Sequence, residues 1–375
     1  MKSTIQVSAF SLLALLGVNA QAALVSSATS NTFNLTASKT DTNLTATATS
    51  SSNVTPSGTA PSLAKFNDAN GVLTGVTFSL NSNRTQTVSG SATKGMGPGF
   101  TANFAGSSTA SLAAPGVTTQ NFNAAISAST SCSLSMGPSG SCTAAAGTSG
   151  AVATNASSLS VAAVNLNSYA TTGSGNVSGI ALTLPTISAN ISPQSGYTLT
   201  GTSASTSLAW TGTVSASYSY LLHALASFDG GSSANALTLD FGTVAQNSIA
   251  SLNFGLFNLA NADRTGLDLD GFAGSGDTSA FSTDLSVFSN LAQSGNQGFI
   301  ANLLTSNVGA FSAQYIINLS DADIGASSTW KNQTLTLNLV GNVTAVPVPS
   351  AVWLFGSALL GFLGVSRRKT AVSLS

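Results

Sequence analysis

The sequence has 375 residues, of which only 6% carry a charged side chain, against about 25% in an average globular protein. Lys and Arg number 10 and the acids number 11, all of them Asp, so the net charge is −1 with the single His neutral. With only two Cys as well, this composition excludes most acid-base, metal-cluster and phosphate-binding chemistry. Ala, Ser, Thr, Asn and 36 Gly dominate the chain, a mixture that disfavours helices and is tolerated in strands and turns.

Residues 1–22 have the features of a secretory signal peptide. Lys2 precedes a short apolar run, and small residues come before the cleavage point, as the A-x-A rule requires. We expect cleavage between Ala22 and Ala23, with cleavage after Ala20 as the alternative. A retained anchor is the other interpretation, but a membrane-spanning helix needs about 20 apolar residues.

Residues 23–227 form the first predicted domain, a Ser/Thr/Ala/Gly-rich β structure. Apolar residues alternate with polar ones over 73–80 and again over 209–220, which predicts two half-buried strands. Between them, residues 107–207 contain few large apolar side chains. Because small side chains bury little area each, we expect this middle region to pack thinly.

The opening of this domain carries a turn followed by a strand. Phe66 begins the turn, Gly71 follows it, and Val76 lies in the strand. The pattern resembles the opening of choice-of-anchor type E domains, in which a Phe-Asp-Pro-x-x-Gly-x-Leu turn precedes a Val-Thr strand, although here Asn67 and Asp68 replace Asp-Pro. The resemblance implies a β module of exported bacterial proteins with interchangeable C-terminal anchors, a class for which no activity is established.

Cys132 and Cys142 flank a Gly-Pro-Ser-Gly turn at residues 137–140. In an exported chain, such a pair predicts a disulfide that closes a hairpin or loop. A zinc site is not expected, because two thiols cannot complete one and the only His, His223, lies far away in the sequence.

Residues 228–345 form the second predicted domain, which begins at a Gly/Ser-rich turn. Its two cations and nine acids give a net charge of −7, whereas residues 23–227 carry four cations and two acids, a net charge of +2. Runs with apolar residues at alternate positions predict strands of a β-sandwich. These runs are 237–242, 250–259, 309–319 and 334–343.

The Asp-Phe-Gly opening of the second domain and the alternating strand after it resemble Ig-like modules of exported bacterial anchor proteins. Together, the two predicted domains indicate an all-β fold class. It consists of two antiparallel β-sandwich-like domains, the second of them Ig-like, between an N-terminal signal peptide and a C-terminal transmembrane helix.

Three acids of the second domain form the densest polar group in the chain. Asp268, Asp270 and Asp277 lie among glycines, and carboxylates at bends are ligands that Ca²⁺ accepts. Their spacing is not that of an EF-hand, so the alternative is a strand on which Asp268 and Asp270 face water while their apolar neighbours face the core. These three residues are the calcium candidate, and no other metal site and no cofactor is predicted.

A hydrolase would have to use His223 as its base, with a serine and Asp229 as partners. No Ser of the sequence lies in the Gly-x-Ser-x-Gly pattern of a nucleophile elbow, so we predict no enzymatic activity. Nucleic-acid binding is not expected either, because six cations spread over the chain between the two ends cannot form a phosphate-binding surface.

Residues 346–375 form a segment with three parts. Its apolar run from Ser350 to Ser366 covers about 25 Å as a helix, slightly less than a bilayer core of about 30 Å. A single transmembrane helix is therefore predicted, with the cations that follow it in the cytoplasm and the body of the protein outside. The flanking residues are Val346, Pro347, Val348, Pro349 and Ser350 before the helix, and Arg367, Arg368 and Lys369 after it.

This order of a proline motif, a glycine-patterned apolar helix and an arginine-rich end resembles the PEP-CTERM sorting signal of Gram-negative bacteria. The resemblance covers residues 346–369, with Val348 where the family name implies Glu. In that family exosortase, a membrane-embedded cysteine transpeptidase, recognises the signal, removes the helix and passes the ectodomain outward. The resemblance implies exosortase as processing partner and a setting beside exopolysaccharide, and the alternative is a permanent single-pass anchor that nothing cleaves.

We therefore expect an exported, non-enzymatic protein of the cell surface or extracellular matrix, associated with exopolysaccharide or biofilm. Before processing it is anchored in the inner membrane by the C-terminal helix. The alternative function is a carbohydrate- or calcium-dependent adhesion module that remains permanently anchored there.

Overall fold

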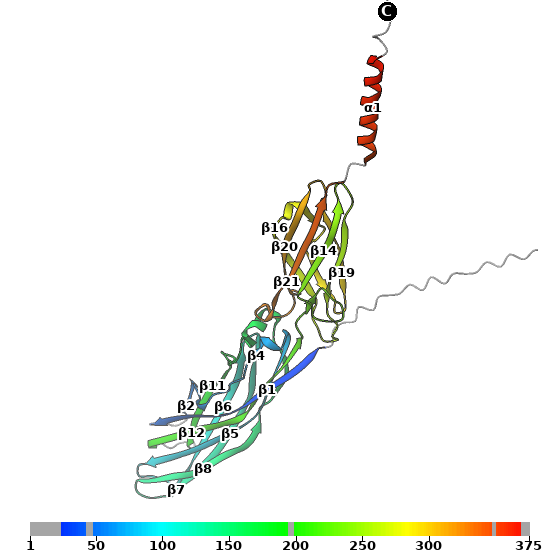
Figure 1. The fold of residues 1–375 in the computed structure, drawn as a ribbon. Helices are drawn as coiled ribbons and strands as arrows, with labels where there is room; N and C mark the ends of the chain where they lie inside the picture. The colour runs from blue at the N-terminus through cyan, green and yellow to red at the C-terminus, as the bar shows by residue number, and fades with distance from the viewer. Residues whose placement is uncertain (1–23, 43–47, 194–198, 347–349, 369–375) are drawn as a thin grey trace, which may run out of the picture. The chain divides into compact units, whose positions relative to one another are not determined.

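The structure, a computed structural model, describes residues 24–42, 48–193, 199–346 and 350–368. Most of them lie in β-strands, as the composition predicts (Figure 1). The chain divides into two compact units. The first comprises Met1–Ala224, Asn261–Thr265 and Asp321–Lys331, and the second comprises Leu225–Ala260, Gly266–Ser320 and Asn332–Ser375.

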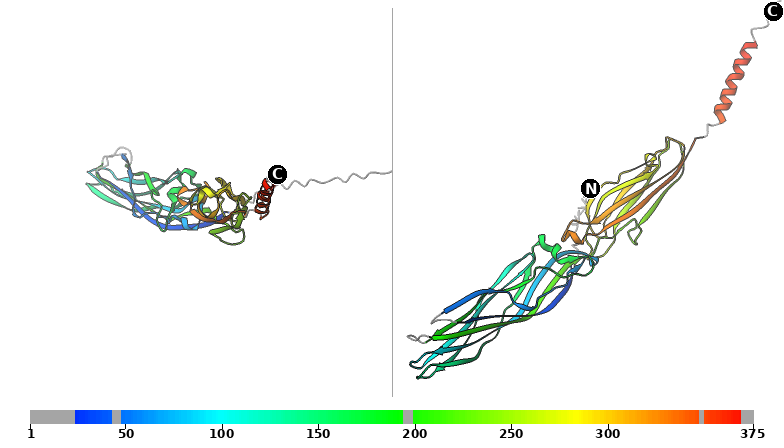
Figure 2. Two further views of the ribbon diagram at one scale, coloured as in Figure 1. Left: turned by 45° about the horizontal axis from the view of Figure 1, so that its top comes forward. Right: turned by 90° about the vertical axis from the view of Figure 1, so that its left-hand side faces the viewer.

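The first unit is built on two antiparallel sheets, whose long strands run alongside one another (Figure 2). One sheet has the order β3-β1-β12-β5-β8, with β9 also paired to β5, and the other has the order β2-β11-β6-β7, while β4 and β10 form a short parallel pair. The strands are β1 (Val25–Thr42), β2 (Ala48–Val54), β3 (Ser57–Thr59), β4 (Phe66–Asn67), β5 (Val72–Lys94), β6 (Phe100–Ala114), β7 (Val117–Leu134), β8 (Gly140–Ala153), β9 (Ala156–Ser160), β10 (Ala170–Thr171), β11 (Ala181–Pro193) and β12 (Leu199–Leu221). Short 3₁₀ turns lie at η1 (Asp68–Asn70), η2 (Ala163–Tyr169) and η4 (Ser327–Thr329).

The second unit also has two main sheets, of order β13-β15-β19-β17 and β14-β21-β20-β16-β18. The predicted antiparallel pairing holds for the other strand pairs described in this unit, but it is wrong for β14, which pairs parallel with β21. β14 is the edge strand of its sheet, and the other neighbour of β21 is the antiparallel strand β20. The alternation of apolar residues reports which face of a strand is buried and not the direction of its neighbour, so the sequence could not show this. The strands are β13 (Ala226–Ser227), β14 (Ala236–Ala245), β15 (Ser251–Asn258), β16 (Leu267–Gly276), β17 (Phe281–Thr283), β18 (Phe288–Leu291), β19 (Asn296–Leu303), β20 (Gly309–Asp321) and β21 (Asn332–Thr344), with the 3₁₀ turn η3 (Thr278–Ala280) between β16 and β17.

The two strands predicted in the first domain are parts of β5 and β12, which are each 23 residues long. On β5, Val76, Phe78 and Leu80 are buried at alternate positions, as a strand with one face on the core requires. The prediction ended near Leu80 because the next inward positions are Ser82 and Arg84, which are polar and nevertheless buried. The strand therefore continues beyond the point where the apolar alternation stops.

The core of the first unit consists of two apolar clusters, each drawing on both sheets, which makes this unit a β-sandwich. The larger cluster includes Phe33 and Trp210 from one sheet and Leu112 from the other. In the smaller cluster half of the buried residues are Ala, whose small side chains bury little area each. Phe104 fills part of that space by lying against Gly90, where a side chain would collide with its ring.

Cys132 and Cys142 form a disulfide with a Cα–Cα distance of 5.9 Å. Cys132 belongs to β7 and Cys142 to β8, and these strands lie in different sheets. The predicted disulfide is confirmed, and it closes the loop between β7 and β8. Because these strands belong to different sheets, the bond also joins the edges of the two layers of the sandwich.

The division of the chain differs in detail from the predicted boundary between residues 227 and 228. The first unit ends at Ala224, and it includes Asn261–Thr265 and Asp321–Lys331 from the range predicted for the second domain. Hydrogen bonds explain the second of these additions, because Ala326 donates to Leu73 O at 2.8 Å and Thr329 Oγ1 accepts from Leu73 N at 3.1 Å.

The one α-helix among the described residues is α1 (Ser350–Arg368), which covers the predicted apolar run. Its large apolar side chains from Trp353 to Leu363 are exposed. The sequence predicted that this helix spans a membrane; within the described part of the chain, no helix has the length and apolar character needed to cross one.

Candidate functional site

The structure describes part of the predicted sorting motif. Val346 is exposed, Ser350 begins α1, and Arg367 and Arg368 end it. The other predicted positions, namely Pro347, Val348, Pro349, Lys369 and the signal-peptide residues Ala22 and Ala23, lie outside the described residues.

The three acids of the calcium candidate do not come together. Asp268 is buried and accepts a hydrogen bond from the Asn290 N–H at 2.6 Å, so it does not face water as the alternative interpretation assumed. Asp270 accepts from a serine hydroxyl, and Asp277 accepts from the Ser312 N–H at 2.9 Å. Over the described ranges, no group of three His, Cys, Asp or Glu side chains is placed to hold a metal ion. Each carboxylate is instead an acceptor for a nearby protein donor.

His223 lies just after β12, where it contacts two segments of the first unit that are distant in sequence. Its Nδ1 is 2.7 Å from Asp321 Oδ2, and its Nε2 is 2.8 Å from the Asp68 carbonyl oxygen. Both partners are acceptors, so both ring nitrogens donate when His223 is protonated, and the ring is then an imidazolium. Burial lowers the pKa of His223, but the hydrogen bond and charge of Asp321 and the Asp68 carbonyl outweigh it, so the pKa is raised.

Asp321 is fully buried and is satisfied by several donors. Its Oδ1 accepts the Ala224 N–H at 2.7 Å, and its Oδ2 accepts the Lys331 N–H at 2.8 Å as well as the His223 ring. An imidazolium with both nitrogens engaged has no lone pair for a substrate proton, so this geometry is that of a structural ion pair. Asp229, the partner considered from the sequence, accepts the Ser232 hydroxyl at 2.6 Å.

A second polar group lies inside the first unit, among the inward-facing side chains of its two sheets. We call it the polar belt. Its members are Ser82, Arg84, Gln86, Ser108, Thr154 and Thr206, and each is at most 3% exposed.

Hydrogen bonds tie the belt to both sheets. Gln86 accepts from Ser108 Oγ of β6 at 2.6 Å and donates to Thr206 Oγ1 of β12. Trp210 Nε1 donates to Ser82 Oγ at 3.0 Å. Because buried polar groups are stable only when paired, the belt fixes how the two sheets face each other at this level.

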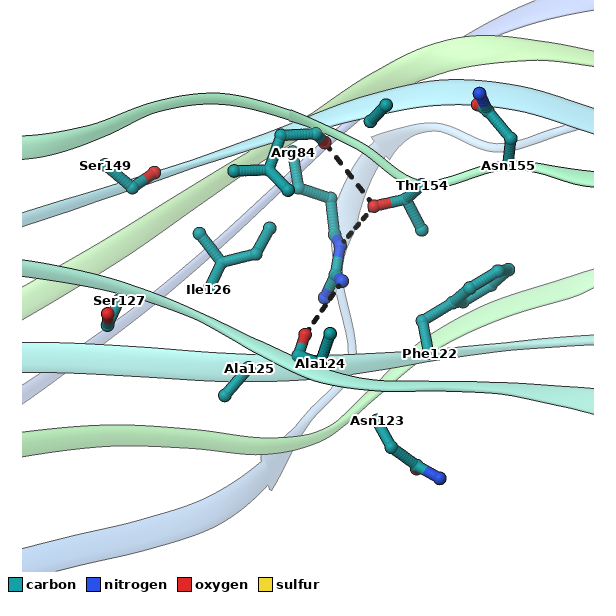
Figure 3. A pocket seen from close by; sticks show the side chains of 12 residues that line it. Arg84, Phe122, Asn123, Ala124, Ala125, Ile126, Ser127, Ser149, Thr154 and Asn155 are labelled. Atoms are coloured by element: carbon teal, nitrogen blue, oxygen red, sulfur yellow. Dashed lines mark hydrogen bonds between the residues drawn. The ribbon is translucent and has the colours of Figure 1, made fainter.

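Arg84 is the charged member of the belt. Its Nε donates to Thr154 Oγ1 at 2.8 Å, and Nη2 donates to the Ala124 carbonyl at 3.4 Å (Figure 3). The guanidinium carbon lies 5.9 Å from the centroid of the Trp210 ring. Burial lowers the pKa of Arg84, yet a guanidinium stays protonated at physiological pH. Its Nη1 is buried and has no hydrogen-bond partner among the described residues.

A pocket of about 460 Å³ opens beside Arg84. It is lined by residues 122–127 of β7, by Ser149, Val152 and Ala153 of β8, and by Thr154 and Asn155 that follow (Figure 3). The pocket thus lies between edge strands of the two sheets.

No known protein family and no curated protein matches this chain. Solved structures resemble parts of it. PapD-like domain 7 of human CEP192 is 14% identical, covering 29% of this chain and 82% of that domain with a TM-score of 0.22. WR4, an MSP family member of C. elegans, is 7% identical over 26% of this chain and 91% of its own, with a TM-score of 0.19. The periplasmic chaperone SfaE is 8% identical over 30% of this chain and 59% of its own, with a TM-score of 0.21. Likenesses this distant carry no argument about function.

Two residues of the sites described above, Asp321 of the ion pair and Arg84 of the polar belt, were not predicted from the sequence. Asp321 belongs to an Ile-x-Leu-Ser-Asp stretch that reads as the end of a strand, and nothing local indicates that it pairs with His223. Arg84 had a detectable signal, because it lies at an even spacing from Val76, Phe78 and Leu80 and hence on the inward face of the same strand.

Proposed function

We propose that this chain is an exported, non-enzymatic protein of the bacterial cell surface or extracellular matrix, and that residues 346–369 are a PEP-CTERM sorting signal processed by exosortase. The observation that carries the proposal is the helix α1. It displays Trp353, Leu354 and Phe355 to solvent and ends at Arg367 and Arg368. A helix with this much exposed apolar surface needs a partner or a membrane surface, and we propose that it is held at the inner membrane until processing.

The rest of the chain is compatible with this role. Two β-sandwich units and a disulfide suit a protein that works outside the cytoplasm, where disulfides persist. We propose further that the second unit is an Ig-like module, on the basis of its paired sheets and its edge strand β14. The charges of His223 and Asp321 are used within the fold, which favours a structural and interaction role over catalysis.

Tags at two positions test the processing step. One epitope is inserted at Ser232, an exposed residue, and a second follows Lys369, and both are traced by cell fractionation and intact mass in the native host. We expect the Ser232 tag on the outer surface or in the medium, separated from the tail tag. If both tags stay together in the inner membrane, exosortase processing is excluded, and the chain is a permanently anchored module.

Charge variants of the tail provide the matched comparison. Replacing Arg367, Arg368 and Lys369 by Gln removes the cations at the end of the helix while leaving the strands of both units unchanged. We expect the unprocessed precursor to accumulate, whereas Lys65→Gln, a cation removed from the first unit, is processed normally. Equal processing of both variants would contradict a role for the cationic end in the signal.

A further inference from the structure

We propose that the pocket beside Arg84 binds the carboxylate of an acidic sugar, with the buried guanidinium as its counter-ion. This inference concerns the first unit alone and does not depend on how the tail is processed.

The first argument is charge. Arg84 is 2% exposed, and no described carboxylate forms an ion pair with it, since the ion pairs found are Lys39 with Asp41 and His223 with Asp321. None of the residues that line the pocket is acidic. A charge removed from water without a partner costs several kcal/mol, so the folded protein gains from an external anion at this position.

The second argument is the unused donor. Arg84 is held in one orientation by Thr154 at Nε and by the Ala124 carbonyl at Nη2. Because the side chain is already ordered in the free protein, binding an anion would not cost its conformational entropy. The group left over is Nη1, which has no acceptor within the described residues. An acceptor that reaches this donor forms a charge-assisted hydrogen bond, which is about twice as strong as a neutral one.

The third argument is that the strands are irregular at this place. Ser108 pairs with Ile126 while Ala110 pairs with Phe122, so β7 has extra residues opposite β6. The pairing of β8 with β5 also shifts, beside Gly150, whose φ is 71°. Such bulges bend an edge strand and occur often at binding sites, and here they border the pocket on both of its walls.

The lining favours a sugar over a bare anion. Asn123, Ser127, Ser149 and Asn155 contribute amides and hydroxyls, and Phe122 contributes an aromatic ring. Hydroxyls of a pyranose are recognised by such neutral polar groups, and its apolar face packs on an aromatic ring. The volume of about 460 Å³ falls within the range of about 300–1,000 Å³ typical of small-molecule sites, and a carboxylate alone would fill little of it.

Calorimetric titration of the full chain tests the proposal, with D-glucuronate, D-glucose and acetate as probes. We expect glucuronate to bind at one site. The affinities of glucose and acetate should be lower by a factor of about ten or more, because glucose lacks the carboxylate and acetate lacks the sugar ring. Equal binding of glucose would overturn the role of the carboxylate. Equal binding of acetate would overturn the assignment to a sugar, and no binding of glucuronate would overturn the site.

Variants locate the binding. Arg84→Met removes the cation and should lower glucuronate affinity about tenfold or more. Should that variant fail to fold, Ala153→Trp decides the question, because it fills the pocket from an exposed position and leaves Arg84 in place. Ala146→Trp, on the same strand but outside the lining, is the matched control and should bind normally. Undiminished binding by Ala153→Trp would place the sugar elsewhere and overturn the proposal.

Discussion

At the scale of single residues, buried ionisable groups of the first unit differ in whether they have a partner of opposite charge. His223 and Asp321 form an ion pair, with the carboxylate fully buried and the imidazole mostly so. Arg84 is equally buried but has only neutral partners. Substitutions of His223 and Asp321 are therefore expected to change the free energy of unfolding, and substitution of Arg84 is expected to change anion binding.

The stability of the first unit should depend on pH through His223. Its pKa is raised in the folded protein, so its contribution is complete below the ordinary value of about 6.5 and is lost as pH rises through the folded pKa. We therefore expect the free energy of unfolding to fall above about pH 6.5. Urea titrations between about pH 5.5 and pH 8.5 measure this slope, and His223→Gln should abolish it, since the chain has no other His.

Asp321→Ala should be more damaging than His223→Gln at pH 6. It leaves the Ala224 and Lys331 N–H groups and a buried imidazole without their acceptor, a loss of about 3–5 kcal/mol when one partner of a buried pair is removed. Asp229→Asn, at an exposed turn, is the control and should change stability little. A smaller loss for Asp321→Ala than for His223→Gln would contradict the structural assignment.

Two glycines of β5 provide a matched test of core packing. A Cβ at Gly90 would collide with the Phe104 ring, whereas at Gly75 it would meet the Ser219 Cβ at an ordinary 3.7 Å. Gly90→Ala should lose about 1–3 kcal/mol by overpacking, while Gly75→Ala should be close to neutral. Thermal denaturation of both variants measures the difference, and equal melting temperatures would contradict the packing described for this cluster.

At the scale of elements, the long strands β5 and β12 organise the first unit. They pair with each other along their length, and β5 also pairs with β8 and β9 while β12 pairs with β1. Their inward positions change from apolar to polar and back to small apolar residues, as Phe78, Arg84 and Ala92 illustrate. Large side chains therefore stabilise one end of the sandwich. The end near the disulfide combines an Ala-rich cluster that contains Phe100 and Phe104 with strand pairing and the covalent bond.

The disulfide should contribute to the stability of the first unit, because it closes a short loop and joins the edges of two sheets beside the Ala-rich cluster. Reduction, or the Cys132→Ser/Cys142→Ser double variant, should cost about 2–4 kcal/mol. Thermal unfolding with and without a reductant measures this, and the double variant should be insensitive to reductant. A melting temperature unaffected by reduction would show that strand pairing alone holds this edge.

At the scale of the whole molecule, the first unit is discontinuous in sequence. Asp321–Lys331 belongs to it and supplies the Asp321 carboxylate, the Thr329 hydroxyl and the buried Ala326. A contiguous fragment that ends near the predicted boundary omits all three.

A fragment of residues 24–227 should therefore be less stable than the first unit within the full chain. It leaves His223 without its carboxylate and Leu73 N–H without its acceptor, so we expect a loss of about 3 kcal/mol or more. Circular dichroism melting curves of the fragment and the full chain provide the comparison. If the fragment has the same melting temperature as the full chain, the segment Asp321–Lys331 contributes nothing to stability.

The sequence by itself determined the predominance of β structure, the position of the main strands, the two cysteines as a pair and the apolar helix. These are local properties: alternation along 309–319 or 334–343 reports which face of a strand is buried, and composition reports which secondary structure is favoured. Such patterns do not report which strand lies beside which.

Only the tertiary structure decided the partners. It placed β14 parallel to β21, put Cys132 and Cys142 in different sheets, separated Asp268, Asp270 and Asp277, and joined His223 to Asp321 across 98 residues. The reason is physical: many strands of this chain have similar small side chains, so pairing is selected by packing and burial over the whole unit. For Arg84 the even spacing along the strand already indicates the inward face, and the tertiary structure decided its partners, Thr154 and Ala124.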